Sequence, residues 1–134
     1  MTTSYLVKDF MTTNVTTLSP DMEIVRALNL LIDKNISGAP VMDDNGDLVG
    51  MFTERDCMRV ILNAAYHQEY GGIVKEIMAT GVKVVTPNDS IVDIARRFYE
   101  ERYQRYPVMD GDLLVGQISR SDVIRALGNA WNRQ

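Results

Sequence analysis

The stretch Leu48-Val49-Gly50-Met51-Phe52-Thr53-Glu54-Arg55-Asp56 occurs a second time as Leu114-Val115-Gly116-Gln117-Ile118-Ser119-Arg120-Ser121-Asp122. Each copy is a short apolar run with a glycine inside it, followed by a hydroxyl residue and, three residues later, an aspartate. The apolar run predicts a strand, and the residues after the aspartate predict an amphipathic helix. The chain therefore places a hydroxyl and a carboxylate at the same strand-to-helix junction twice.

The remainder of the chain is duplicated as well, which predicts a tandem repeat. We place the first repeat at residues 1–66, a linker at 67–73 and the second repeat at 74–134. A unit of this size buries too little apolar surface to be stable alone, so the two repeats should share an interface. The recurring pairs are Val7–Met11 with Val74–Met78, Pro20 with Pro87, and Pro40–Asp43 with Pro107–Asp110.

Within each repeat the pattern predicts the element order β-α-β-β-α, an α/β fold of the α+β-like kind. The Asn45-Gly46 and Asp110-Gly111 pairs are typical of hairpin turns, because both positions tolerate a positive φ. The closing helices are expected near residues 54–65 and 120–131. The first strand of each repeat is expected at residues 15–18 and 82–85. The first helix of each repeat is expected to carry one apolar stripe, formed by Ile24, Ala27, Leu28, Leu31 and Ile32 in the first repeat and by Ile91, Ile94, Ala95, Phe98 and Tyr99 in the second.

Composition and charge narrow the class of protein. The chain has 134 residues, of which 46% are apolar and 24% charged, as in a globular domain. No apolar run approaches the ~18 residues of a membrane span, so we expect no membrane partner. There is no secretory signal, and one cysteine cannot form an internal disulfide. We therefore expect a cytoplasmic protein. The net charge of −4 without a basic stripe argues against nucleic acid as a partner.

The sequence supplies no catalytic constellation, so no enzyme activity is expected. His67 is the single histidine and falls in the predicted linker, and Cys57 is the single cysteine. Spaced cysteines and histidines of the kind that hold zinc are missing from the sequence. We expect Cys57 to be buried rather than reactive.

The duplicated combination of Pro-Val-Met-Asp, a turn, and Leu-Val-Gly-x-Phe/Ile-Thr/Ser-x-x-Asp resembles the cystathionine-β-synthase (CBS) domain pair, or Bateman module, over about Val7 to Leu127. The resemblance implies two repeats packed through their sheets with pseudo-twofold symmetry. It implies clefts that bind an adenosine-containing ligand (AMP, ADP, ATP or S-adenosylmethionine) and a regulatory role. It also implies a flat homodimer formed through helical faces.

The chemistry of the repeated motif has two interpretations. Thr53 with Asp56, and Ser119 with Asp122, stand at helix starts, where unpaired N–H groups attract phosphate. The aspartate suits a ribose diol, since a carboxylate accepts hydrogen bonds from both hydroxyls. The same pattern is also a capping box, in which the two side chains satisfy the helix itself.

The resemblance places a segment that contacts adenine just before the second strand. In one type of cleft, Ser37 and Gly38 of the first repeat would face Ser119 and Asp122 of the second. Arg105 matches a position where some relatives carry an arginine that contacts phosphate; alternatively it is a solvated surface arginine paired with Glu100 or Glu101.

The flanking residues make the two motifs unequal. Arg120 lies at the start of the second closing helix, and Glu54 takes its place in the first, where it would repel phosphate. We therefore expect the Ser119/Asp122/Arg105 cleft to bind phosphorylated ligands more tightly than the Thr53/Asp56 cleft.

The function predicted from the sequence is that of a stand-alone nucleotide sensor, not itself catalytic, that modulates an unidentified protein partner. The alternative is a non-catalytic structural or protein-interaction module whose clefts stay empty. The two differ in whether adenosine-containing ligands bind.

Overall fold

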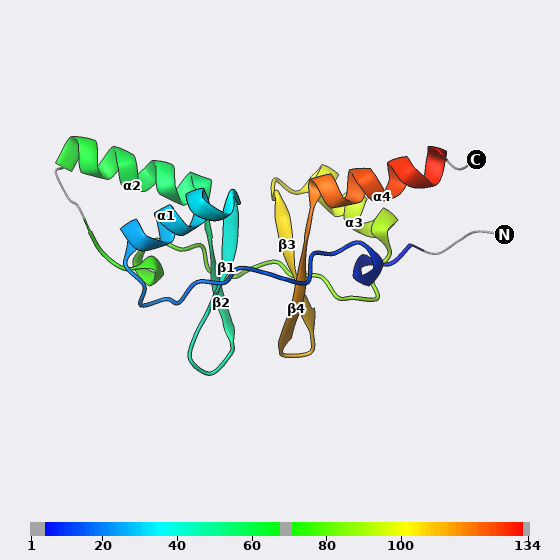
Figure 1. Cartoon of the computed structure of the whole chain (residues 1–134), viewed down its shortest axis with the longest axis horizontal. Coiled ribbons are helices and arrows are strands. Elements are labelled where there is room, and N and C mark those ends of the chain that lie inside the picture. Colours follow the sequence, from blue (N-terminus) through cyan, green and yellow to red (C-terminus); the bar gives the residue numbers. More distant parts are fainter. Residues whose placement is uncertain (1–4, 68–70, 133–134) are drawn as a thin grey trace. The chain divides into compact units, whose positions relative to one another are not determined.

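The computed structural model describes residues 5–67 and 71–132. Of these, residues 16–67 and 71–82 form one compact unit, called the inner unit below, and residues 5–15 and 83–132 form the other, called the outer unit. Each unit has one antiparallel hairpin and two helices (Figure 1). The inner unit contains α1 (Ile24–Lys34), β1 (Gly38–Met42), β2 (Leu48–Thr53), α2 (Glu54–His67) and the short 3₁₀ helix η2 (Val74–Glu76); the outer unit contains η1 (Val7–Asp9), α3 (Ile91–Glu100), β3 (Arg105–Asp110), β4 (Leu113–Ser119) and α4 (Arg120–Asn132).

The helices and hairpins agree with the predicted order, which confirms the mixed α/β class. The closing helices α2 and α4 begin directly after the hydroxyl residues Thr53 and Ser119. Helix α2 continues to His67, the first residue of the predicted linker. In the described part of the chain, no helix combines the length and the apolar character that crossing a bilayer requires.

The predicted first strands are reduced to single bridges, and the chain's four prolines explain why. Leu18 forms an isolated parallel bridge with Val41, and its N–H donates to the Pro40 carbonyl at 2.9 Å. The next ladder bonds would need the N–H of Pro40 on one side and of Pro20 on the other, and proline has none. Pro107 and Pro87 limit the Val85–Val108 bridge of the outer unit in the same way. Predicting full strands at 15–18 and 82–85 was therefore wrong.

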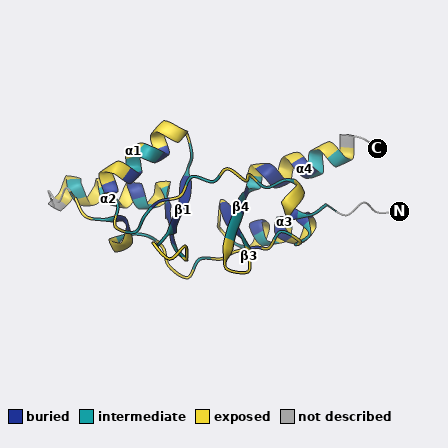
Figure 2. Cartoon of the chain, turned by 60° about the horizontal axis from the view of Figure 1, so that its bottom comes forward, coloured by how far each residue is buried: buried dark blue, intermediate teal, exposed yellow. Residues whose placement is uncertain are grey.

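The apolar stripes of the first helices are buried as predicted except at their last residues. Ile24 and Leu31 of α1 are 3% and 4% exposed, whereas Ile32 is 65% exposed. Tyr99, at the corresponding place on α3, is 93% exposed. Each of these residues lies eight positions after the first residue of its stripe. Eight residues of an α-helix make two full turns plus ~80°, so these side chains point away from the buried face. Figure 2 shows β1 mainly buried, β4 mainly of intermediate burial, and both buried and exposed residues along the helices.

Each sequence repeat contributes its lead-in segment to the other compact unit. Val7 belongs to the core around Tyr106 and Ile118, and Val74 belongs to the core around Phe52. Figure 1 shows η1 (dark blue) beside α3, and the green η2 beside α1. Ala79 exchanges two 2.9 Å backbone hydrogen bonds with Met51, and Thr12 does so with Gln117. The sequence repeats, placed at 1–66 and 74–134, therefore differ from the compact units, because each unit combines residues of both repeats.

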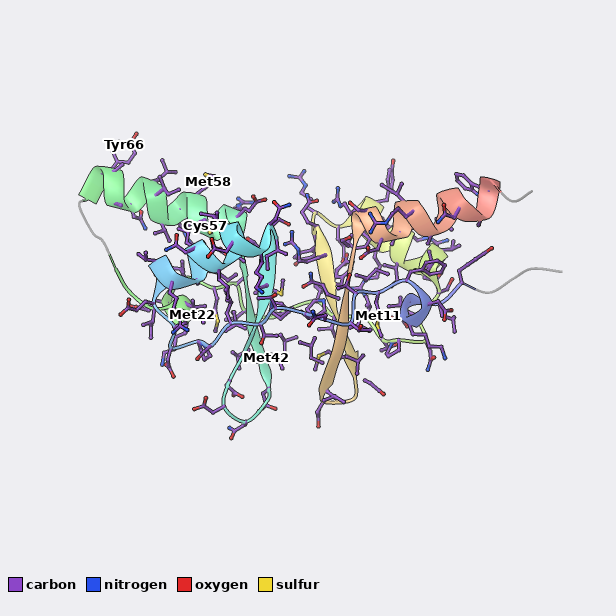
Figure 3. All side chains as sticks on the ribbon, viewed as in Figure 1. Met11, Met22, Met42, Cys57, Met58 and Tyr66 are labelled. Carbon is purple, nitrogen blue, oxygen red and sulfur yellow. The ribbon has the colours of Figure 1, made fainter. Side chains whose placement is uncertain are left out.

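The glycine inside each copy of the motif is the point where the lead-in segment of the other sequence repeat, called the exchanged segment below, crosses the strand. A Cβ atom on Gly50 would lie 2.5 Å from Met78 Sδ and 2.9 Å from the Ala79 carbonyl oxygen. On Gly116 it would lie 2.7 Å from Met11 Sδ and 2.8 Å from the Thr12 carbonyl oxygen. Figure 3 places Met11 beside β4. The backbone oxygens are held by strand pairing, so a side chain here must displace the segment.

We expect Gly50→Ala and Gly116→Ala each to lower the free energy of unfolding by about 1–3 kcal/mol, as overpacked sites do. Gly128→Ala is the matched control, because Gly128 lies in α4 and a Cβ atom there would meet no other atom within 4 Å; it should be neutral or stabilising. Urea unfolding of the three variants measures this. A Gly116→Ala protein as stable as Gly128→Ala would contradict the crossing constraint.

Candidate functional site

In the inner unit, Thr53 and Asp56 close the start of α2. The Thr53 N–H donates to Asp56 Oδ2 at 2.8 Å, and the Thr53 hydroxyl donates to the same oxygen at 3.3 Å. Arg59 donates to Asp56 Oδ1 at 3.4 Å. The helix therefore begins with the carboxylate half of the predicted capping box, while the Thr53 hydroxyl bonds to the carboxylate instead of accepting from a backbone N–H.

In the outer unit, Ser119 and Asp122 cap α4 reciprocally. The Ser119 N–H donates to Asp122 Oδ2 at 2.9 Å, and the Asp122 N–H donates to Ser119 Oγ at 3.2 Å. Arg125 donates to Asp122 Oδ1. Asp122 is 9% exposed, and its carboxylate accepts from two groups, the Ser119 N–H and the Arg125 guanidinium.

The two caps leave different hydrogen-bonding capacity for a ligand. A carboxylate offers about four acceptor positions. Asp56 uses three of them, for the two Thr53 bonds and for Arg59, whereas Asp122 uses two, for Ser119 and Arg125. The Thr53 hydroxyl donates its hydrogen bond to Asp56. The Ser119 hydroxyl accepts from the Asp122 N–H, so its own proton remains available for donation. Asp122 and Ser119 can therefore bind a diol and a phosphate oxygen without breaking the cap.

Strand register brings the other predicted residues next to these caps. Gly38 pairs with Thr53, and Arg105 pairs with Ser119. The Ser37 carbonyl accepts the Glu54 N–H at 2.9 Å, so Ser37 also lies at the start of α2. Each unit thus gathers its own predicted residues, and the facing of Ser37 and Gly38 toward Ser119 and Asp122 stays a prediction.

Arg105 is buried, with 9% of its surface exposed. The alternative interpretation as a solvated surface arginine is therefore wrong. A guanidinium remains charged at any physiological pH, so its burial beside Ser119 puts a fixed positive charge at the start of α4. Gly38 brings no charge to the corresponding place in the inner unit.

Arg120 binds backbone rather than a side chain. Its Nε donates to the Tyr103 carbonyl at 2.8 Å, and its Nη2 donates to the Glu101 carbonyl at 3.3 Å. The Arg120 backbone N–H donates to the Gln104 carbonyl at 3.2 Å. This side chain therefore holds the segment between α3 and β3 against the start of α4, a structural contact that the sequence did not predict.

Two further arginines were missed in the sequence. Arg59 and Arg125 each follow the motif aspartate by three residues, and each pairs with it. Arg59 also donates to the Ile77 carbonyl of the exchanged segment. The signal was present, because the two arginines are separated by the same 66 residues as the two aspartates.

A second cluster fixes the segment before Arg105. The Tyr106 hydroxyl donates to Glu101 Oε1 at 2.6 Å, and the Arg97 guanidinium lies 4.4 Å from the centre of the Tyr106 ring. Burial, followed by the bond to Glu101, raises the pKa of the Tyr106 hydroxyl well above its usual value. The bond from Tyr106 is the main reason that the pKa of Glu101 falls below its usual value.

These two shifts predict a pH dependence of stability. The folded protein favours the neutral phenol of Tyr106. Its contribution to the free energy of unfolding is therefore complete below about 10, the pKa of this tyrosine in the unfolded chain, and declines as the pH rises above that value. The Glu101 contribution is present above its unfolded pKa of about 4.5 and is lost as the pH falls toward the lower folded value. Tyr106→Phe should remove the alkaline slope and reduce the acidic one, because Arg97 and Lys83 also lower the pKa of Glu101. Parallel pH curves for the two proteins, measured by urea unfolding, would contradict this assignment.

Neither Cys57 nor any metal cluster adds chemistry to the site. Cys57 is 6% exposed, which confirms the predicted burial. Figure 3 shows it on the side of α2 toward α1, while Met58 and Tyr66 point away. Burial, followed by the neighbouring Asp56 and Glu54, raises the pKa of the thiol and keeps it protonated. In the described ranges no three histidine, cysteine or acidic residues come together as metal ligands would.

Comparison with known proteins identifies the class. The CBS domain matches residues 7–63 and 74–129, one copy in each sequence repeat. The chain therefore belongs to the CBS domain family and is a tandem CBS pair, and modules of this class are regulatory and non-catalytic.

Relatives and solved structures agree with this class. CBSX2, a chloroplastic CBS protein of Arabidopsis thaliana, is 30% identical over 91% of this chain and 63% of its own length. YhcV of Bacillus subtilis is 33% identical over 87% of this chain and 81% of its own. The crystal structure of CBSX2 in complex with AMP superposes with a TM-score of 0.85 at 33% identity, covering 95% of this chain and 98% of that one.

A structure of the CBS pair of protein MJ0100 contains 5′-methylthioadenosine and S-adenosyl-L-methionine. It has a TM-score of 0.81 at 26% identity, over 96% of this chain and 99% of that one. The chain spans 44% of MJ1225, an uncharacterised protein of Methanocaldococcus jannaschii to which it is 33% identical over 93% of its own length. Some relatives are therefore much longer than this chain.

Proposed function

We propose that this CBS pair is a regulatory module that binds an adenosine-containing ligand, namely AMP, ADP, ATP or S-adenosylmethionine, and thereby modulates a partner protein. The observation that carries the proposal is the pair Ser119 and Asp122, with spare hydrogen-bonding capacity at the start of α4 and the buried Arg105 beside it. The relatives crystallised with AMP and with S-adenosylmethionine support the ligand class.

Each residue has a defined task in the proposed complex. Asp122 accepts hydrogen bonds from the ribose diol, and the Ser119 hydroxyl donates to phosphate. Arg105 supplies a positive charge for the phosphate, which joins the N–H groups at the helix start. Ser37 and Gly38 contact the base, where the missing side chain of Gly38 allows a flat ring to approach the backbone.

The Thr53 and Asp56 pair is the weaker site in this proposal. Asp56 has one spare acceptor position, and the Thr53 hydroxyl proton is already used. Glu54 adds a negative charge, and Gly38 rather than an arginine stands across from Thr53. Arg120 contributes to the stronger site mainly through the segment that it holds, with its charge as a secondary attraction for phosphate.

Ligand binding regulates by selecting one arrangement of the two repeats. The ligand favours whichever arrangement binds it more tightly. A partner protein that binds this arrangement more tightly then responds to the ligand concentration. We place the protein in the cytoplasm, although the relative CBSX2 is chloroplastic.

Thermal unfolding in the presence of AMP, ADP, ATP and S-adenosylmethionine tests the proposal. A ligand at ~100 times its Kd should stabilise the protein by about 2.7 kcal/mol. We expect Asp122→Ala to abolish this stabilisation and Asp56→Ala to retain most of it. Asp122→Asn preserves a capping oxygen and so separates loss of binding from loss of the helix cap.

Asp112→Ala is the control, because Asp112 lies in the exposed β3–β4 turn. Equal losses in the Asp56 and Asp122 variants would contradict the inequality of the two sites. No stabilisation by any of the four ligands would favour the alternative function, an interaction module with empty clefts.

We further propose that the protein is a homodimer formed through its helical faces. A groove lies between the two helices of each unit, and in the outer unit it is lined mainly by the apolar residues Phe98, Val123, Ile124, Leu127 and Trp131. Ile124 and Trp131 are 70% and 69% exposed, which is costly for a large apolar pair in water. The groove between α1 and α2 has a similar rim formed by Ile32, Met58 and Ile61.

Light scattering at micromolar concentration should give twice the chain mass of 15.1 kDa. Ile124→Lys should shift the population toward monomer, because it places a charge in the apolar rim. Leu113→Lys is the matched control, since Leu113 is 65% exposed but lies at the β3–β4 turn. A wild-type chain that remains at 15.1 kDa would contradict the dimer.

A further inference from the structure

The side-chain amide of Gln117 in β4 has an unused oxygen. Gln117 Oε1 is buried, and none of the residues in the described part of the chain donates a hydrogen bond to it. The backbone of the same residue is fully paired, because its N–H and its carbonyl both bond to Thr12 at 2.9 Å. A buried acceptor without a donor destabilises a fold, so its retention needs an explanation.

The position of Gln117 relates this oxygen to the proposed site. Successive side chains of a strand alternate between its faces, so Gln117 and Ser119 project from the same face of β4. The register pairs Pro107 with Gln117 and Arg105 with Ser119, and cross-strand partners share a face. The register shift of this hairpin falls between Val108 and Met109 and leaves these pairs unaffected.

The spacing suits a nucleoside. Two residues along a strand place Gln117 ~6.7 Å from Ser119, which is comparable to the separation between the phosphate and the base of a nucleoside 5′-monophosphate. A ligand whose ribose is bound at Asp122 can therefore extend its base along β4 to Gln117. Glutamine matches the hydrogen-bonding edge of adenine, and its amide oxygen accepts from the 6-amino group.

We propose that Gln117 is the residue that recognises the base, by accepting a hydrogen bond from the 6-amino group of the adenine. This inference rests on the proposed function and adds the residue that selects the base. The equivalent residue of the first motif copy is Met51, which is apolar and 8% exposed. The first copy therefore lacks this means of selection.

The experiment compares AMP with purine riboside 5′-monophosphate, which is identical except that the 6-amino group is missing. Isothermal titration of the wild type should show an affinity about tenfold higher for AMP. Gln117→Met places the residue of the first copy at this position, and it should bind both compounds with similar affinity. Because methionine has a comparable volume and no buried polar atom, the unliganded variant should be at least as stable as the wild type. Gln117→Leu is a second variant should Gln117→Met fold poorly.

Asp122→Ala distinguishes failure of this inference from failure of the proposed function. If AMP binding depends on Asp122, but the preference for AMP is unchanged in Gln117→Met and Gln117→Leu, the role of Gln117 is refuted and the proposed function stands. If the wild type binds none of AMP, ADP, ATP and S-adenosylmethionine, both are refuted; if it binds one of these other than AMP, the comparison is made with that ligand and its analogue without the 6-amino group. A preference lost in the Gln117 variants alone, with Asp122-dependent binding retained, supports the inference.

Discussion

The crossing of an exchanged segment over a glycine is the constraint on which each unit depends. Gly116 lies under Met11 and Thr12, and Gly50 lies under Met78 and Ala79. The contact is possible because a glycine has no Cβ, and it extends each hairpin by one more backbone pairing. It also places an apolar lead-in, with Val7 or Val74, in the core of the unit. The opening motif therefore has two functions, since its glycine organises the fold and its hydroxyl and aspartate form the helix start.

The two copies of the motif show how a duplicated helix cap can diverge. Both aspartates bond to the residue before the helix and to an arginine three residues later, so the structural role is preserved in both. The differences are in the surrounding residues and in the direction of one hydroxyl bond. Ser119 accepts where Thr53 donates. In the proposed function the same side chains serve as a helix cap and as a ligand site, and the flanking charges set the difference in affinity between the two copies.

The sequence predicted the element order, the hairpins and both helix starts, because these follow from local periodicity and turn chemistry. It did not predict that the lead-in segments are exchanged, since Val7 and Val74 look equivalent and either core would accept either valine. The short parallel bridges could have been anticipated, because Pro20 and Pro40 lack the donors that a longer ladder needs. The exposure of Ile32 and Tyr99 could also have been anticipated, because each lies eight residues after the first stripe position and is turned ~80° away from it.

The same limits apply to the site. Its hydroxyl, aspartate and glycine positions were evident from the duplication, and Arg59 and Arg125 could have been found from their identical spacing. The bonds of Arg120 to the Tyr103 and Glu101 carbonyls depend on the path of the segment between α3 and β3, which no pattern in the sequence describes. The unused oxygen of Gln117 likewise becomes visible only when the neighbours of β4 are in place.

The exchange of lead-in segments also bears on the order of folding. The inner unit is one continuous stretch of chain, whereas the outer unit joins residues 5–15 to residues 83–132 across the whole of the inner one. A ribosome therefore completes the inner unit first, while the lead-in residues of the outer unit still lack their partners. Closing that long loop costs entropy that grows only slowly with its length, and a folded inner unit shortens the flexible chain that the closure must order. The duplication thus yields two similar units that assemble in sequence rather than in parallel.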